Sequence, residues 1–134
     1  MTKLRAQSLL VVDDEPAIAN FLAEVAKDAG WKADTAHTIG AVENRFQRGH
    51  PQLVVTDLAM PGHDGIELLR WLSERTYLGK LILISACDRS VLGSSVDLAL
   101  LYGLRVVGSA QKPIDAAQFE GLLKEAQSIS AWSV

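Results

Sequence analysis

The sequence has few of the features that would place it in several large classes of protein. It holds one cysteine, Cys87, among 134 residues, which excludes an intramolecular disulfide and a zinc site built from several cysteines. No apolar run approaches the roughly 18 residues that a membrane-spanning helix needs, and residues 1–7 lack the apolar core of a signal peptide. We therefore expect a soluble, cytoplasmic protein with no membrane partner.

Positive charge is not in excess either. Thirteen Lys and Arg residues stand against sixteen Asp and Glu residues, so the formal net charge is -3. Proteins that wrap nucleic acid depend on a strongly basic surface. We therefore expect no direct binding of nucleic acid.

What the sequence does contain is an alternation of apolar runs and helical patterns. The apolar runs at 9–12, 53–56 and 81–84 are typical of buried strands, and weaker strands are predicted at 31–36 and 105–107. Apolar residues at helical spacing predict helices after each run, the first beginning at Pro16 and the last near Asp115. The stretch from Met60 to Gly65 reads as a turn-rich loop.

This order predicts the α/β fold class. Five strands separated by helices imply right-handed crossovers and a five-stranded parallel sheet with helices on both faces. We expect a doubly wound, flavodoxin-like (βα)5 domain with strand order 2-1-3-4-5. Residues 1–134 form one domain, with a core at about 8–127 and a tail or the start of a linker at 128–134.

In such folds, ligands bind beyond the carboxyl ends of the strands. Those ends carry Asp13 and Asp14, Asp57, Ser85, and Lys112. The alternation therefore predicts that these scattered residues form one site. Read singly, each has a plainer explanation; the two neighbouring aspartates, for example, could serve only as favourable charges at the start of a helix.

The charges at this edge indicate a chemistry. Neighbouring carboxylates repel one another by roughly 1 kcal/mol per pair in water and about 4 kcal/mol at a more protein-like dielectric. A hard cation such as Mg²⁺ resolves this conflict and also binds phosphate oxygens. With an ammonium from Lys112 and a hydroxyl from Ser85, the set suits phosphoryl transfer to a carboxylate. Asp57 is the natural acceptor, because no second acid lies beside it.

Four segments together resemble the receiver domain of bacterial two-component response regulators. They are residues 11–15, residues 57–65, Ser85 with Ala86, and Lys112 with Pro113. Each is weak evidence alone, but all four in this order are specific. The resemblance extends from about Leu9 to Ala126 and implies a phosphoprotein in phosphorelay signal transduction, a signalling domain rather than an enzyme acting on a separate substrate.

The resemblance also implies roles for these residues. Asp57 would accept phosphate from the phosphohistidine of a sensor histidine kinase or phosphotransfer protein. Mg²⁺ would be bound by Asp57, by Asp14 directly, by Asp13 through water and by the carbonyl of Ala59. Ser85, the backbone of Ala86 and Lys112 would hold the phosphoryl oxygens, and the Lys112–Pro113 bond is cis in relatives.

The sequence departs from the family at Ser109. Relatives usually carry Tyr or Phe three residues before the lysine, and that ring moves inward as the hydroxyl at the Ser85 position is drawn to the phosphate. A switch region containing Ser85 and Ser109 must therefore work without the ring. This departure keeps one alternative open, a receiver that does not switch and serves as a dimerisation or scaffolding module.

Other interpretations fit less well. A flavin- or nucleotide-binding protein would need a Gly- or Ser-rich phosphate loop where Asp13 and Asp14 stand. A phosphatase using an aspartyl phosphate would need a second acid at Ala59. For partners, residues 102–114 resemble receivers attached to cyclic-di-GMP phosphodiesterase domains, which makes such a domain a candidate output. A second copy is another candidate partner, through the fourth helix, fifth strand and fifth helix.

Overall fold

The computed structural model describes residues 7–60 and 63–130. Strands and helices alternate along most of the chain, as the sequence predicts. The strands and helices, in order, are β1 (Ser8–Val12), α1 (Pro16–Asp28), β2 (Lys32–Ala36), α2 (Ile39–Gln47), β3 (Leu53–Asp57), β4 (Ala59–Met60), β5 (His63–Asp64), α3 (Gly65–Glu74), β6 (Lys80–Ser85), α4 (Arg89–Leu101), β7 (Arg105–Gln111) and α5 (Ala116–Ser130).

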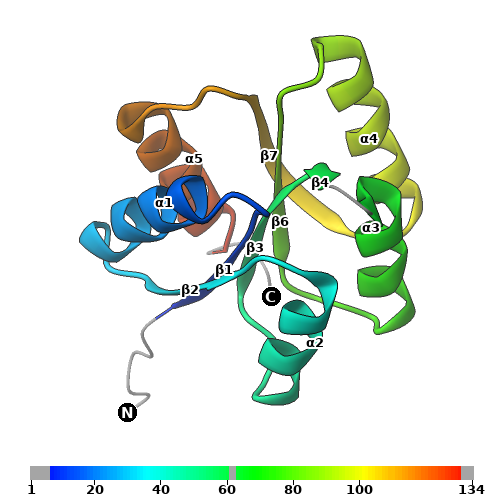
Figure 1. The fold of residues 1–134 in the computed structure, drawn as a ribbon, viewed down its shortest axis with the longest axis horizontal. Helices are drawn as coiled ribbons and strands as arrows, with labels where there is room; N and C mark the ends of the chain where they lie inside the picture. The colour runs from blue at the N-terminus through cyan, green and yellow to red at the C-terminus, as the bar shows by residue number, and fades with distance from the viewer. Residues whose placement is uncertain (1–6, 61–62, 131–134) are drawn as a thin grey trace.

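Five of the strands form one parallel sheet in the order β2-β1-β3-β6-β7 (Figure 1). Apart from the short pair β4 and β5, this is the predicted order 2-1-3-4-5. Because all five strands run the same way, their carboxyl ends meet at one edge of the sheet. The predicted fold class is therefore confirmed.

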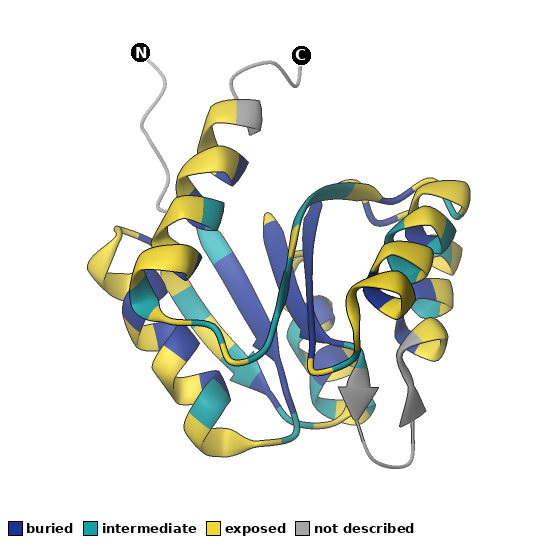
Figure 2. Cartoon of the chain, turned by 90° about the horizontal axis from the view of Figure 1, so that it is seen from above, coloured by how far each residue is buried: buried dark blue, intermediate teal, exposed yellow. Residues whose placement is uncertain are grey.

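Helices cover both faces of the sheet, and each face has its own core. Alternate strand residues point to opposite faces, so Leu10 and Leu83 pack with α2, α3 and α4, while Leu9 and Ile82 pack with α1 and α5. Figure 2 shows the buried strands between two layers of helices whose exposed sides face outwards. The central strands β3 and β6 are buried along their whole length.

The structure adds two features to the predicted elements. The expected loop after β3 contains the short antiparallel pair β4 and β5, and Pro61 and Gly62 of that loop lie outside the described residues. The last strand, expected at 105–107, continues to Gln111 after a register irregularity opposite Leu81 and Ile82. Helix α5 extends to Ser130, and residues 131–134 of the expected tail lie outside the described part.

Among the described residues, no helix is both long and apolar enough to span a bilayer.

Candidate phosphoryl-acceptor site

Three aspartates lie together at the carboxyl edge of the sheet. Asp13 and Asp14 follow β1, and Asp57 is the last residue of β3, the neighbouring strand. One carboxylate oxygen from each of the three lies within 4.8 Å of the others. Asp13 and Asp57 are buried, whereas Asp14 is half-buried. The cluster thus has two carboxylates away from solvent and a third, that of Asp14, nearer the surface.

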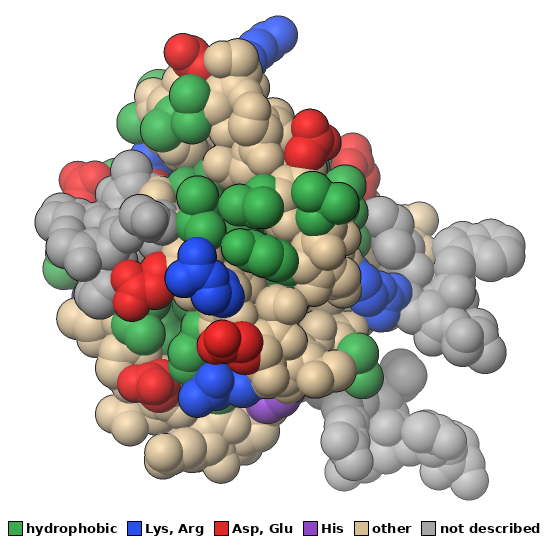
Figure 3. All heavy atoms as spheres, turned by 90° about the vertical axis from the view of Figure 1, so that its right-hand side faces the viewer, with side chains coloured by type: hydrophobic (Ala, Val, Ile, Leu, Met, Phe, Trp, Pro, Cys, Tyr) green, Lys and Arg blue, Asp and Glu red, His purple; other side chains and the backbone are tan. Residues whose placement is uncertain are grey.

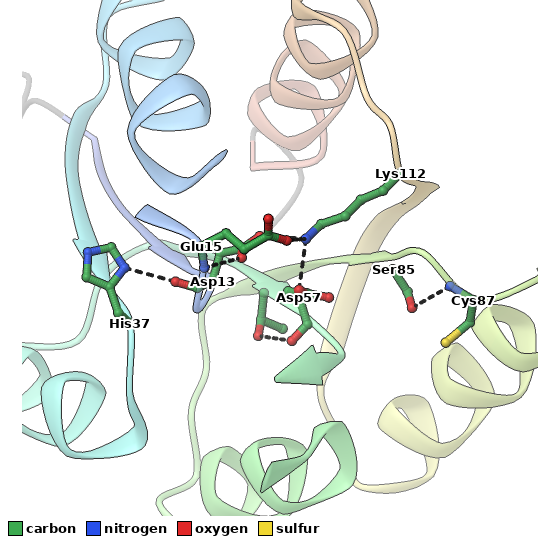
Figure 4. A network of polar contacts seen from close by, with 8 residues as sticks. Asp13, Glu15, His37, Asp57, Ser85, Cys87 and Lys112 are labelled. Atoms are coloured by element: carbon green, nitrogen blue, oxygen red, sulfur yellow. Dashed lines mark hydrogen bonds and ion pairs between the residues drawn. The ribbon is translucent and has the colours of Figure 1, made fainter. Parts of the chain in front are cut away.

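Lys112 extends across the mouth of this cluster from the end of β7 (Figure 4). Its Nζ lies 2.8 Å from Oδ2 of Asp13 and 2.8 Å from Oδ2 of Asp57. A third carboxylate, that of Glu15, is 3.9 Å away. The Lys112–Pro113 bond is cis, as the family resemblance implied. One ammonium therefore joins the ends of β1, β3 and β7.

The protonation of Lys112 follows from these contacts. Burial of the ammonium lowers its pKa, but the hydrogen bonds and negative charges of Asp13 and Asp57 act in the opposite direction and outweigh it. The net effect raises the pKa of Lys112 above its ordinary value. The side chain is therefore a firmly charged cation at neutral pH.

Backbone contacts fix the position of Asp13. Its N–H donates to the carbonyl of Ala36, and its Oδ1 accepts the N–H of Glu15 at 2.9 Å. Nδ1 of His37 lies 2.9 Å from the carbonyl oxygen of Asp13, and because a carbonyl only accepts, Nδ1 must carry the hydrogen. The loop after β2 thus holds the acidic loop after β1.

Ser85 ends β6 and is fully buried. Its hydroxyl oxygen accepts the N–H of Cys87 at 3.1 Å, and Figure 4 shows the hydroxyl turned toward Cys87. Its carbonyl accepts the N–H of Lys112 at 2.8 Å. The backbone therefore ties the Ser85 position directly to the lysine, while the hydroxyl is engaged within its own loop.

The other predicted residues are spread around this centre. Ala86 is exposed in the loop between β6 and α4, and Ala59 begins β4 two residues after Asp57. Ser109 is an exposed residue of β7, paired with Leu83 in the ladder. The structure brings Asp13, Asp14, Asp57 and Lys112 together at one point. The roles assigned to all these residues remain predictions.

Three further residues belong to the site and were not singled out from the sequence as part of it. Glu15 adds a carboxylate near Lys112, His37 holds the backbone of Asp13, and Gln111 donates from Nε2 to the carbonyl of Cys87 at 2.9 Å. Glu15 could have been found, because it directly follows the two aspartates. His37 and Gln111 act through backbone atoms, so their types alone carry no signal.

The donor set fits a hard divalent cation. In phosphoryl-transfer sites Mg²⁺ is bound by one or two carboxylates and by phosphate oxygens, and it keeps several waters. The arrangement of Asp13, Asp14 and Asp57 supplies such ligands on one side, and Lys112 supplies a mobile positive charge on the other. Fold and site together define a doubly wound α/β protein with an acidic cluster at the carboxyl ends of its strands.

The chain belongs to the response regulator receiver domain family, whose model matches residues 9–123. Among curated proteins it is similar to protein Rrf1 of Nitratidesulfovibrio vulgaris, at 29% identity over 118 residues that cover 88% of this chain and 80% of that protein. Response regulator Rre1 of Synechocystis is 28% identical over 118 residues, 87% of this chain and 50% of Rre1. The family resemblance of the sequence is thereby confirmed.

Other relatives are longer than the matched segment. The transcriptional regulatory proteins TrcR of Mycobacterium tuberculosis and BasR of Escherichia coli are 31% and 29% identical over 80 residues, 60% of this chain in both cases. The match covers 31% of TrcR and 36% of BasR. The chain thus spans about a third of the length of these regulators.

Solved structures agree with the fold. A response regulator from Colwellia psychrerythraea superposes with a TM-score of 0.77 at 28% identity, covering 92% of this chain and 99% of that one. The chemotaxis response regulator CheY4 of Vibrio cholerae gives a TM-score of 0.75 at 18% identity over 91% of this chain and 99% of that one. At that lower identity the likeness shows the fold alone.

Proposed function

We propose that Asp57 accepts a phosphoryl group from the phosphohistidine of a sensor histidine kinase or phosphotransfer protein, with Mg²⁺ bound beside it. The observation that carries this proposal is the position of Asp57. Its buried carboxylate lies within 4.8 Å of the carboxylates of Asp13 and Asp14 and 2.8 Å from the ammonium of Lys112. Membership of the receiver family supports the same role.

The reaction is a transfer between two nucleophiles. An oxygen of the Asp57 carboxylate attacks phosphorus, the P–N bond of phosphohistidine breaks, and its electron pair returns to the imidazole of the donor. When bound, Mg²⁺ neutralises negative charge on the phosphoryl oxygens. Asp57 and Asp14 would hold the ion directly, Asp13 would hold it through water, and the carbonyl of Ala59 would complete the protein ligands.

During this reaction Lys112 changes its partner from carboxylates to the phosphoryl group. Before transfer, its ammonium neutralises the buried carboxylates of Asp13 and Asp57. After transfer, the phosphoryl oxygens on Asp57 carry more charge than the original carboxylate. The ammonium then pairs with the phosphoryl group, together with the hydroxyl of Ser85 and the backbone N–H of Ala86.

Phosphorylation shifts an existing equilibrium between two conformations and so controls a partner. The protein is a signalling domain of the cytoplasm whose only catalysis is its own phosphotransfer and dephosphorylation. The output is another domain or protein, for which a cyclic-di-GMP phosphodiesterase domain is one candidate. A second copy docking through α4, β7 and α5 is a further candidate partner. The described apolar residues most exposed on α4 are Val91, Leu100 and Leu101.

The proposal is tested by treating the protein with Mg²⁺ and phosphoramidate and weighing it by intact-mass spectrometry. We expect the wild type to gain one phosphoryl group and Asp57→Asn to gain none. Asp97→Asn, which removes an exposed aspartate of α4, is the matched control and should react as the wild type does. A folded wild type whose mass stays unchanged would overturn the proposal and leave the scaffolding alternative.

A further inference from the structure

Gln111 lies beside the site, and the proposed chemistry does not use its side chain. It is the last residue of β7, directly before Lys112, and it pairs with Ser85 in the ladder between β6 and β7. Its side chain is partly buried, and its Nε2 donates to the carbonyl of Cys87 at 2.9 Å. A single side chain thus connects the strand that carries Lys112 with the loop that follows Ser85.

The loop from Ser85 to Cys87 is held by few other interactions. The hydroxyl of Ser85 accepts the N–H of Cys87 at 3.1 Å, which closes the loop on itself. Cys87 precedes Asp88, the residue that caps α4, so its carbonyl lies outside the hydrogen-bond ladder of that helix. The bond from Gln111 therefore acts on the loop itself.

Helix α4, which follows this loop, is weakly anchored. Among its thirteen residues only Leu92 and Ala99 are buried, whereas α1, of the same length, buries five. Elements with few buried apolar contacts are the ones that move most readily. A small change in the preceding loop can therefore be passed to α4.

The alternation of side chains along β7 places Gln111 on the same face of the strand as Ser109. Ser109 and Gln111 are two residues apart, so their side chains lie on the same face of the strand. That is the face on which relatives carry an aromatic ring at the position of Ser109. Since serine is too small to bridge to the loop between β6 and α4, the link on this face comes from Gln111 instead.

We propose that Gln111 is a positioning residue of the switch, a role that rests on the proposed function of Asp57. Its hydrogen bond to Cys87 stabilises the loop in the unphosphorylated arrangement, with the Ser85 hydroxyl occupied by the N–H of Cys87. When a phosphoryl group on Asp57 draws Ser85 and Ala86 toward it, this bond is given up and α4 shifts. The side chain of Gln111 thus replaces the aromatic ring as the link between strand and loop.

The test is to replace Gln111 by methionine, which keeps the length of the side chain and removes the N–H donor. In Mg²⁺, beryllofluoride serves as the phosphoryl mimic, and its affinity is measured by titration. We expect Gln111→Met to bind it about fivefold more tightly than the wild type, the factor that one lost intramolecular hydrogen bond supplies. A substitution that only damaged the site would weaken beryllofluoride binding. Tighter binding therefore distinguishes the proposed role of Gln111 from such damage.

Hydrogen exchange of the metal-free protein gives a second readout. Amides of residues 86–91 should exchange about fivefold faster in Gln111→Met, with no change in α1. Gln111→Glu, which turns a carboxylate toward the carbonyl of Cys87, should speed exchange at these amides more strongly. Gln47→Met, at an exposed glutamine of α2, is the matched control and should show neither faster exchange nor tighter beryllofluoride binding.

The outcomes separate this inference from the function on which it rests. If the wild type fails to bind beryllofluoride, the acceptor role of Asp57 is wrong and the inference falls with it. If the wild type binds but Gln111→Met shows equal or weaker affinity, the acceptor role stands and the role of Gln111 is overturned. Unchanged exchange at residues 86–91 would overturn it as well.

Discussion

Lys112 neutralises a pair of carboxylates that the fold has placed out of water. Asp13 and Asp57 are each almost fully buried, and one ammonium lies 2.8 Å from an oxygen of both. Removing one member of such a group leaves uncompensated buried charge, which is more costly than the pair itself is favourable. The lysine therefore stabilises the metal-free fold as well as taking part in the proposed chemistry.

This predicts a pH-dependent stability. The pKa of Lys112 is raised in the folded state, so its stabilisation is complete below the unfolded pKa, about 10.4, and is lost as the pH rises through the folded pKa. Lys112→Met should be less stable than the wild type by about 2 kcal/mol at pH 7 in chelator. Its free energy of unfolding should also fall less steeply between about pH 10 and 12. Urea unfolding across this range measures both quantities.

Tyr77 must be separated from this effect. Burial raises the pKa of its phenol well above the ordinary value, so it also makes the wild type less stable at high pH. Tyr77→Phe removes that contribution and leaves the contribution of Lys112. A double variant that keeps the full alkaline loss of stability would contradict the assignment to these two residues.

At the scale of residues, the sequence predicted the charged residues at the centre of the site but not the residues that hold the surrounding loops. Asp13, Asp57 and Lys112 could be found because their charges stand at strand ends, where the fold gathers ligands. The contacts of His37 and Gln111 could not, because both side chains bind backbone carbonyls. Which carbonyl lies within reach depends on the path of the loops, and residue types do not specify that path.

Helix α4 carries a glycine in its interior. Gly93 lies in its second turn, and a Cβ built there meets nothing within 4 Å. Glycine in a helix interior is less favourable than alanine by roughly 0.5–1 kcal/mol. The helix that the proposed switch would move is therefore weakened by its own sequence as well as by its sparse packing.

Gly93→Ala should raise the free energy of unfolding by roughly 0.5–1 kcal/mol. Gly121→Ala, in α5, is a matched control, because a Cβ there also meets nothing within 4 Å. Urea unfolding should show a similar gain for both. Hydrogen exchange should show slower opening of α4 in Gly93→Ala alone, and equal slowing of α4 in both variants would count against its local weakness.

Elements with strong patterns were predicted well, and so was the weaker strand β2, but the end of β7 and the pair β4 and β5 were not. The run at β6, with six buried residues, leaves no ambiguity. The end of β7, from Gly108 to Gln111, has little strand propensity of its own. It is extended because it pairs with the neighbouring strand β6. The pair β4 and β5 is only two residues long on each side, too short for a period of two to appear in the sequence.

The molecule as a whole should respond to the metal. A ligand that binds only the folded state stabilises it, by about 2.7 kcal/mol at a concentration 100 times its dissociation constant. We expect Mg²⁺ to raise the thermal midpoint of the wild type, with Asp14→Asn losing more of this gain than Asp13→Asn, because Asp14 is assigned as the direct ligand. Titration calorimetry should rank the Mg²⁺ affinities in the same order.

The two substitutions should also differ without metal. Asp14→Asn removes a repulsive carboxylate from the cluster, so it should raise the stability of the metal-free protein slightly. Asp13→Asn removes a partner of Lys112 and should bring no such gain. Equal Mg²⁺ responses in the wild type and both variants would show that the ligand assignment is wrong.

At the scale of the whole molecule, one face carries a group of exposed apolar side chains. Figure 3 faces the side formed by α3 and α4, and hydrophobic side chains lie together in the middle of it, bordered by charged ones. Ile66 on α3 and Val91, Leu100 and Leu101 on α4 are the exposed large hydrophobic residues of these helices. Much of the apolar surface of α4 therefore faces solvent.

The first described residue and the last helix meet at the edge of the sheet opposite the acidic cluster. Oε1 of Gln7, just before β1, accepts a hydrogen bond from Nε2 of Gln127 in α5 at 3.1 Å. The described part of the chain thus begins near the amino edge of the sheet, where this contact joins it to the last helix. A domain with neighbouring ends can be spliced into a surface loop of a host protein without stretching that loop. Inserted in this way, the domain would hold its acidic edge on the side away from the host.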